Sequence, residues 1–346
     1  MNVRKLSKIP KDKLKDRKIF VRCDMDVPFD TEGNITSTFR IDRCLETIKY
    51  LLANDCSVIL ATKIGRPEKR RISTDKLLPY LKEVLSMDVA FAGGYFEGEV
   101  QKKIKKLHGG GVLLLENVRF YEEEKDDDSP FVSDYAKLFD IFVNEAFAMS
   151  HRREASITGF PKHIPSYAGF NLEQEIDQLE RLMRNPAKPF VFLVGGVKVG
   201  SKLSVIDSLR KNVTDVLIGG RLVLEEEIKK YKGRESVVIG GLTDDTFDID
   251  DETLKAFKEL ISKAKTILWA GPMGKFEEKA HQKGTKEVVD AITSSDAYKV
   301  AGGGDTIAAI EELTSIERFD FVSTGGGAML AFLSGKKLKA LESLKT

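Results

Sequence analysis

Short apolar runs rich in β-branched residues alternate along the chain with longer segments of helical periodicity. Residues 58–61 (VILA), for example, follow the helical segment 40–53 and precede the helical segment 74–85. This alternation is typical of β-α units arranged around a mostly parallel sheet. The predicted strands are residues 19–22, 58–61, 89–92, 112–115, 141–143, 190–194, 216–218, 237–239, 266–269, 299–301 and 319–322.

The chain divides into two such β/α halves on either side of one helical segment. Residues 171–184 (NLEQEIDQLERLMR) are dense in helix formers and end before Asn185-Pro186. Glycine and serine are scarce there, so we interpret the segment as a helix joining two domains rather than a flexible linker. A length of 346 residues, beyond the usual size of a single core, also favours two domains.

Charge and composition narrow the classes of partner. The 55 lysines and arginines nearly balance the 54 aspartates and glutamates, so no global field favours nucleic acid or a membrane surface. The charged N-terminus lacks a signal-peptide core, and no stretch approaches a spanning helix, so we expect a soluble, cytoplasmic protein. The charge runs 66–73 and 121–130 are expected to be solvated loops. The three cysteines form neither a metal-ligand pattern nor a disulfide framework.

Two glycine-rich turns in the second half predict a phosphate site. Each stands between a short apolar run and a helical segment, so glycine would let the backbone approach an anion at a helix N-terminus. The alternative is that the glycines serve only as caps and tight turns. The turns comprise Gly302, Gly303, Gly304, Asp305 and Thr306, and Gly325, Gly326 and Gly327.

A third glycine-rich turn carries two lysines. The segment 195–202 (GGVKVGSK) nearly matches the P-loop pattern but reverses its final Ser and Lys, so we reject a true P-loop. Lys198 and Lys202 could still screen a transferring phosphoryl group and hold nucleotide phosphates, or they could be solvated. Asp305 suits a Mg²⁺ ligand, although its side chain could also cap the following helix.

In the first half, polar and cationic side chains follow the predicted strands. Ligands of open α/β sheets bind beyond the carboxyl ends of the strands, so these side chains could together form an anion pocket. The alternative for each residue alone is an ordinary surface role. The candidates are Arg22, Asp24, Arg40, Lys63, Arg66, Arg119, His151 and Arg152.

These pieces resemble, in order and over nearly the whole chain, the phosphoglycerate kinase family. The matching segments are VRCDMDVP, TSTFRI, KIGRP, LLENVRF, FVNEAFAMSHRREAS, AGFNLEQEI, PFVFLVGGVKVGSK, DVLIGG, WAGPMGKFE, KGT, GGGDT and STGGGA. The resemblance implies two Rossmann-like domains with mostly parallel sheets, joined by a central helix and a hinge. The domains would be residues 1–167 for phosphoglycerate, with the tail 332–346 packing back on them, a joining helix at 168–186, and residues 187–331 for the nucleotide.

The resemblance also implies a role for each matched residue. Arg40 and Lys198 would stabilise the phosphoryl group in flight, Asp305 would hold magnesium, Lys202 would hold nucleotide phosphates, and Glu277 the ribose. The phosphoglycerate would be bound by Asp24, Asp26, Arg40, Lys63, Arg66, Arg119, His151 and Arg152. The ADP or ATP would be surrounded by Gly196, Gly219, Gly220 and the two glycine turns at 302–306 and 325–327. A monomer is the family expectation.

The chain departs from the family pattern at several positions. Asp26 replaces an asparagine and Lys63 replaces a histidine, so the net charge is roughly kept and the two could form an ion pair. Other replacements relative to the family pattern are Glu145, Glu154, Ala270 and Gly200-Ser201. The segment between Gly220 and Asp248 is shorter than in typical members, and Arg221 follows the glycine pair.

Three functions are therefore open. The first is reversible, magnesium-dependent phosphoryl transfer between 1,3-bisphosphoglycerate and ADP, with hinge closure. The second is the activity of a divergent relative that acts on another carboxylate or acyl phosphate, and the third is nucleotide binding without catalysis. Retention of both Arg40 and Lys198 speaks against the third, because a binder has less need of transition-state groups.

Overall fold

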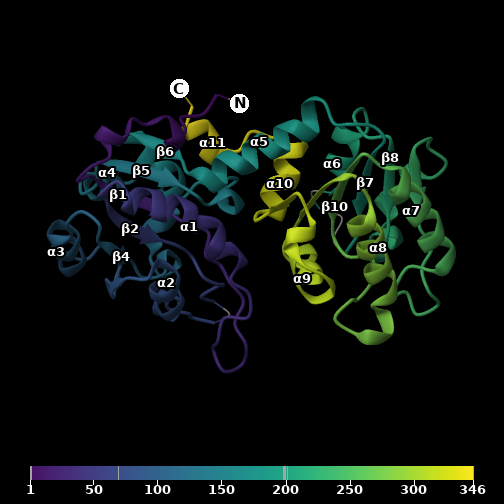
Figure 1. The fold of residues 1–346 in the computed structure, drawn as a ribbon, viewed down its shortest axis with the longest axis horizontal. Coiled ribbons are helices and arrows are strands. Elements are labelled where there is room, and N and C mark those ends of the chain that lie inside the picture. The colour runs from purple at the N-terminus through teal and green to yellow at the C-terminus, as the bar shows by residue number, and fades with distance from the viewer. Residues whose placement is uncertain (1, 69, 198–199, 201, 346) are drawn as a thin grey trace. The chain divides into compact units, whose positions relative to one another are not determined.

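The computed structural model describes residues 2–68, 70–197, 200 and 202–345. These residues form two compact units: unit 1 consists of Met1–Ile176 and Lys337–Thr346, and unit 2 of Asp177–Lys336 (Figure 1). The first division falls inside helix α5 (Phe170–Arg184). The units therefore share this helix, whereas the sequence analysis expected residues 168–186 to stand between two domains.

Unit 1 is built on a sheet of six parallel strands within the described residues, in the order β3-β4-β2-β1-β5-β6. The sequence analysis missed β6, a three-residue edge strand with the sequence SYA. The strands are β1 (Lys18–Arg22), β2 (Ser57–Ala61), β3 (Ala90–Phe91), β4 (Val112–Leu114), β5 (Ile141–Asn144) and β6 (Ser166–Ala168).

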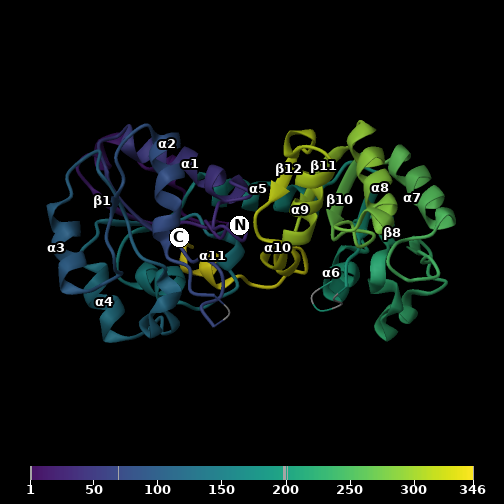
Figure 2. The same cartoon turned by 90° about the horizontal axis from the view of Figure 1, so that it is seen from below.

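Two cores lie on opposite faces of this sheet because neighbouring side chains of a strand point to opposite faces. Ile19 and Val21 pack in a core with α1 and α2, whereas Phe20, between them, packs in a second core with α3 and α4 (Figure 2). The helices are α1 (Phe39–Leu52), α2 (Leu78–Leu85), α3 (Gly98–Lys106) and α4 (Pro130–Ala136).

The C-terminal residues of the chain also belong to unit 1. Helix α11 (Lys339–Ser343) lies beside the N-terminal segment in Figure 1, and the backbone N–H of Arg4 donates to the carbonyl of Leu344 at 2.9 Å. The backbone N–H of Ala340 donates to the carbonyl of Ser150 at 3.0 Å. The second bond fastens the turn that follows β5, and this turn carries the predicted site residues His151 and Arg152.

Unit 2 repeats the architecture, with six parallel strands among its described residues in the order β12-β11-β10-β7-β8-β9. Strand β7 is fully buried, as a central strand of a two-sided parallel sheet should be. The strands are β7 (Phe190–Val194), β8 (Asp215–Ile218), β9 (Val237–Ile239), β10 (Thr266–Ala270), β11 (Tyr298–Gly302) and β12 (Phe321–Ser323).

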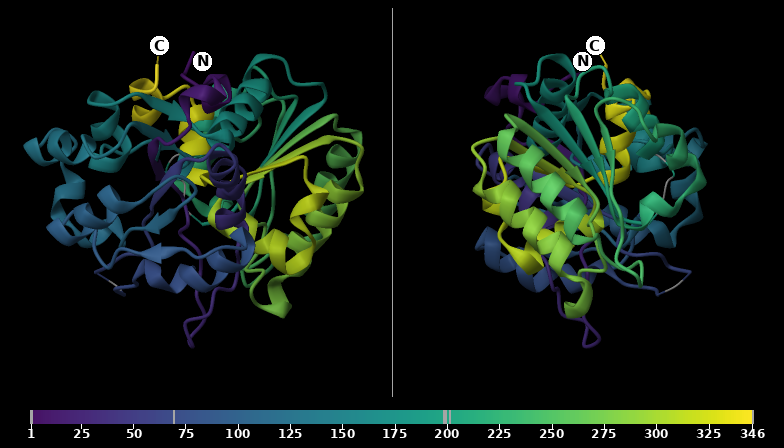
Figure 3. Two further views of the ribbon diagram at one scale, coloured as in Figure 1. Left: turned by 60° about the vertical axis from the view of Figure 1, so that its left-hand side comes forward. Right: turned by 90° about the vertical axis from the view of Figure 1, so that its right-hand side faces the viewer.

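The helices of unit 2 form one group that joins α7, α8 and α9 and another that joins α6 and α10 (Figure 3). Helix α7 begins at a side-chain N-cap, because the side chain of Asp250 accepts a hydrogen bond from the backbone N–H of Thr253 at 2.8 Å. The helices are α6 (Lys202–Leu209), α7 (Asp251–Lys263), α8 (Lys283–Ser294), α9 (Gly304–Leu313) and α10 (Gly326–Leu333).

The charge run at residues 121–130 is not simply a solvated loop. Residues Glu122–Lys125 form a 3-10 turn, and Glu124 and Asp127 within the run are buried. Asp127 accepts hydrogen bonds from Thr158 at 2.6 Å, so a partner distant in sequence compensates its desolvation. The sequence-based expectation was wrong for these two carboxylates because composition alone does not reveal such partners.

Candidate active site

A polar pocket of about 940 Å³ lies in unit 1. Arg66 follows β2, Arg119 follows β4, and His151 and Arg152 follow β5; all four line this pocket, together with Arg153. Parallel strands bring their carboxyl ends to one sheet edge, which explains how residues so far apart in sequence meet. The structure thus brings together four of the predicted substrate residues.

A buried ion pair links Asp24, after β1, to Arg40 in the first turn of α1. The guanidinium Nη1 lies 2.8 Å from Asp24 Oδ2, and the Asp24 side chain is only 1% exposed. Its other oxygen, Oδ1, is buried without a hydrogen-bond partner among the described residues. Asp24 can therefore orient Arg40 and still accept a hydrogen bond from a ligand hydroxyl.

A second ion pair joins the two exchanged residues, Asp26 and Lys63, as the sequence analysis hypothesised. Asp26 Oδ2 accepts from the Lys63 ammonium, and Oδ1 accepts from the backbone N–H of Gly65 at 2.7 Å. Burial opposes ionisation of the Asp26 carboxyl, but Lys63, Gly65 and Arg40 outweigh it and lower its pKa. Burial lowers the pKa of Lys63, against the opposing effect of Asp26.

Arg119 connects this second pair to the pocket. Its Nη1 donates to the carbonyl of Gly65 at 2.8 Å, so the loop after β2 is held from both sides, by Asp26 and by Arg119. The positive charge of Arg119 also contributes to the lowered pKa of Lys63. Arg119 therefore links the Asp26–Lys63 pair to the pocket, whose lining combines arginines with the carboxylates of Glu68, Glu122, Glu124 and Glu154.

His151 lies at the edge of this pocket. Partial burial and the neighbouring Arg152 lower the pKa of its imidazole, so the neutral form dominates near pH 7. A neutral imidazole can still donate one hydrogen bond to an anion.

Arg22 does not belong to the anion pocket, which corrects the sequence-based expectation for this residue. Its side chain is fully buried; Nε donates to Ser156 at 2.7 Å and Nη1 donates to the carbonyl of Cys23 at 2.7 Å. Ser156 also donates to the buried Glu124 at 2.5 Å. Because Arg22 is the last residue of β1 rather than a loop residue, its side chain stays inside the unit and supports Glu124.

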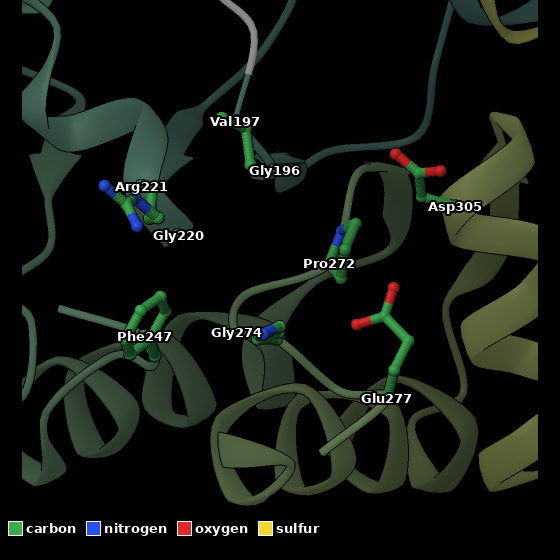
Figure 4. A pocket seen from close by; sticks show the side chains of 10 residues that line it. Gly196, Val197, Gly220, Arg221, Phe247, Pro272, Gly274, Glu277 and Asp305 are labelled. Atoms are coloured by element: carbon green, nitrogen blue, oxygen red, sulfur yellow. The ribbon is translucent and has the colours of Figure 1, made fainter. Parts of the chain in front are cut away.

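A smaller pocket of about 290 Å³ lies in unit 2, at the carboxyl ends of its strands (Figure 4). Of the predicted nucleotide residues, Gly196, Gly220, Glu277 and Asp305 line it. Figure 4 shows Asp305 and Glu277 on one side of the pocket.

Arg221 and Phe247 stand on the opposite side of this pocket in Figure 4. The sequence analysis noted Arg221 as an intrusion near the base pocket but did not find Phe247 or Lys275, which also line the pocket. An isolated aromatic in a loop gives no periodic signal that could have marked it.

The two glycine turns at the starts of α9 and α10 touch each other. A Cβ on Gly326 would lie 2.4 Å from the Cα of Gly303, and Gly303 itself has a φ of +119°. Both positions therefore require glycine, for close approach and for backbone conformation respectively. Gly304 and Gly327 face open space, so their backbones remain accessible.

Other predicted glycines and Thr306 serve the framework. A Cβ on Gly219 would meet Met273 Sδ at 2.6 Å, and one on Gly302 would meet Met329 Sδ at 2.6 Å. Gly325 caps α10, and the buried hydroxyl of Thr306 accepts from the backbone N–H of Gly271 at 2.8 Å. None of these four residues lines the pocket, so they shape its walls from behind.

Lys202 begins helix α6 and donates to the carbonyl of Gly195. Burial lowers the pKa of its ammonium, and the negative charge of Asp305 opposes that shift, so the two residues lie within electrostatic reach. Lys198, the other predicted lysine, lies outside the described residues. No group of three or more potential metal-ligating side chains occurs in the described part of the chain.

Two parallel α/β units, one with an arginine-rich pocket and the other with a glycine-walled pocket, are typical of two-domain α/β kinases that act on small anions. The sequence profile of the family described as "Phosphoglycerate kinase" matches residues 9–235 and 223–336. The chain belongs to the phosphoglycerate kinase family. The two matched pieces meet in the segment that the sequence analysis judged short.

Individual relatives agree with this assignment. Phosphoglycerate kinase from Coprothermobacter proteolyticus is 35% identical over 388 residues, covering 98% of this chain and 99% of the relative. Cytosolic phosphoglycerate kinase 3 from Arabidopsis thaliana is 36% identical over 384 residues, covering 96% of each. These alignments are longer than the chain itself, so the relatives contain residues that it lacks.

Solved structures support the same fold. The crystal structure of phosphoglycerate kinase from Pyrococcus horikoshii OT3 superposes with a TM-score of 0.88 at 29% identity, covering 98% of both chains. The structure of the Coxiella burnetii enzyme gives a TM-score of 0.82 at 29% identity over 99% of this chain and 98% of that one. Among the described helices, none has the length and apolar character needed to cross a bilayer.

Proposed function

We propose that this protein is a phosphoglycerate kinase, which transfers a phosphoryl group reversibly between 1,3-bisphosphoglycerate and ADP to give 3-phosphoglycerate and ATP. The observation that carries the proposal is the pocket of unit 1, where Arg66, Arg119 and Arg152 converge, in the same unit as the Asp24–Arg40 pair. Guanidinium groups match the geometry of phosphate and carboxylate oxygens, so this pocket suits an anion that carries both.

The chemistry requires no nucleophile from the protein, because a carboxylate oxygen of phosphoglycerate attacks the terminal phosphorus of ATP in the reverse direction. Catalysis then consists of positioning and neutralisation of charge. Arg40, held at 2.8 Å by Asp24, would stabilise the acyl-phosphate oxygens, and Lys198 would share that role. The two bound ligands must meet, which the family resemblance ascribes to hinge closure.

On unit 2, Lys202 and the exposed backbone of Gly304 and Gly327 would bind the nucleotide phosphates, and Glu277 would bind the ribose. Asp305 fits a magnesium ion, because its carboxylate lines the phosphate side of the pocket and magnesium usually takes one or two carboxylates plus phosphate oxygens. The bound ion would neutralise phosphate charge. We further infer a cytoplasmic monomer whose partners are these small molecules.

A coupled assay with 3-phosphoglycerate and Mg-ATP tests the proposal, and turnover is the expected result. The substituted pair Asp26–Lys63 favours one second candidate, a kinase for another carboxylate, because this pair changes the charges beside the acid. Failure with 3-phosphoglycerate together with turnover of another acid in a panel of small carboxylates would select that candidate. Nucleotide binding without turnover of any acid would leave a non-catalytic binder.

A further inference from the structure

The pocket of unit 2 has a side that the proposed function leaves unassigned. Asp305 and Glu277 stand on one side, and Arg221 and Phe247 stand on the other (Figure 4). If phosphates and ribose occupy the first side, as the proposed function holds, the base of the nucleotide lies against the second. The inference that follows rests on the proposed function in that respect.

Arg221 is held at the pocket wall by the backbone that precedes it. Gly220 has a φ of +59°, and a Cβ on it would lie 2.9 Å from the backbone nitrogen of Gly196 and 3.0 Å from the carbonyl oxygen of Pro272. The backbone N–H of Leu222 donates to the carbonyl of Gly196 at 2.9 Å. The main chain on both sides of Arg221 is therefore fastened to the pocket floor.

Two cationic side chains, Arg221 and Lys275, lie beside Phe247, and of these two the guanidinium of Arg221 is available to a ligand. Its Cζ lies 5.3 Å from the centroid of Phe247, and Lys275 Nζ lies 5.4 Å from the same centroid. Lys275 pairs with Glu278, which also lies 3.5 Å from His281. Arg221 forms no such ion pair within the described residues, so its N–H donors can face a base.

We propose that Arg221 makes this pocket selective for nucleotides of 6-oxopurines, guanine and hypoxanthine, over those of adenine. The O6 and N7 atoms of a 6-oxopurine are two adjacent acceptors that match the two parallel donors of a guanidinium. Adenine presents an amino donor where O6 would be, so one of the two hydrogen bonds is lost and two donors face each other. Phe247, whose ring centroid lies 5.3 Å from the Arg221 Cζ, helps to hold the guanidinium beside the pocket.

Isothermal titration of GDP, IDP and ADP tests this inference, because binding can be measured without phosphoglycerate. A bidentate arginine discriminates against the wrong base by about 5- to 150-fold. We expect GDP and IDP to bind at least about fivefold more tightly than ADP. The variant R221M should abolish this preference by weakening the binding of GDP and IDP to the level of ADP, and R221K, which keeps the charge but not the fork, should do the same.

Arg234 provides the matched control. Like Arg221 it lies over an aromatic ring, with its Cζ 5.2 Å from the ring centroid of Tyr231, but it does not line this pocket. R234M should leave all three affinities unchanged. Equal or tighter binding of ADP by the unaltered protein overturns the inference, as does an equal loss of all three nucleotides in R221M. Tight GDP binding with weak IDP binding also overturns it, because the 2-amino group would then be what is recognised.

The same protein separates this inference from the proposed function. Selective binding of GDP and IDP without turnover of 3-phosphoglycerate would reject the kinase activity and leave the role of Arg221 intact. Turnover of 3-phosphoglycerate with equal kcat/KM for ATP, GTP and ITP would uphold the activity and reject the role of Arg221.

Discussion

Separating the Asp26–Lys63 ion pair should reveal a coupling far larger than that of a surface pair. The side chains of Lys63 and Asp26 are 9% and 25% exposed, so removing either partner leaves the other charge mostly out of water. Breaking a fully buried pair costs about 3–5 kcal/mol, and exposed pairs contribute about 0–1 kcal/mol. Asp26 keeps its bond from Gly65, so we expect a coupling free energy of about 1–3 kcal/mol for this intermediate case.

The assay is a double-mutant cycle on the free energy of unfolding, with the variants D26N, K63M and D26N/K63M in urea followed by far-ultraviolet circular dichroism. D26N and K63M should each destabilise the protein, and the double variant should recover much of the loss. The control cycle uses D88N and K82M, because Lys82 and Asp88 are also in unit 1 and are 2.7 Å apart but are 46% and 83% exposed. Its coupling should stay below about 0.5 kcal/mol.

Affinity for 3-phosphoglycerate gives the second measurement on the same variants. K63M leaves the Asp26 carboxylate uncompensated beside an anionic ligand, so the Kd should rise about tenfold, and the double variant should bind nearly as tightly as the unaltered protein. Coupling in the D26N/K63M cycle no larger than in the Lys82–Asp88 cycle would refute the reasoning.

Three further predictions concern other parts of the molecule. Burial raises the pKa of Glu145 to about 8, above its ordinary value of 4.5. The folded protein therefore binds a proton that the unfolded chain has lost, and its stability should fall as the pH rises from about 4.5 to 8. In urea unfolding, E145Q should flatten the dependence of stability on pH across that window, and an unchanged pH profile would contradict this. G326A places a methyl group 2.4 Å from the Cα of Gly303 and should lower the Tm and weaken nucleotide binding. In the control G327A, the added methyl group points into open space on helix α10 and should leave the Tm unchanged or higher. Equal effects of the two variants in thermal denaturation would count against the close approach of the two turns. D305N should lower kcat at least about 100-fold at saturating nucleotide, whereas the Kd of ADP measured by titration without magnesium should stay the same. An unchanged dependence of kcat on the magnesium concentration would exclude Asp305 as the magnesium ligand.

The sequence by itself determined the repeating architecture. Strands such as β2 (SVILA) and β7 (FVFLV) are short, mainly apolar runs that contain valine or isoleucine, and buried Ile41, Cys44, Ile48 and Leu51 follow the helical period on one face of α1. Such signals are local, because a strand or helix records its burial in neighbouring residues. The glycine turns before α9 and α10 are also visible in the sequence. The φ of +119° at Gly303 explains why glycine is needed there, because residues with a side chain rarely adopt it.

Tertiary structure decided which charged side chains belong to a pocket and which belong to the interior. Arg22 and Arg66 both follow apolar runs, but Arg22 is buried against Ser156 whereas Arg66 lines a cavity. Arg221 and Phe247 lie 26 positions apart in the chain, yet the fold brings the Arg221 Cζ to 5.3 Å from the Phe247 ring centroid. Burial and distant partners set these outcomes, and neither is encoded in the residues next to a side chain.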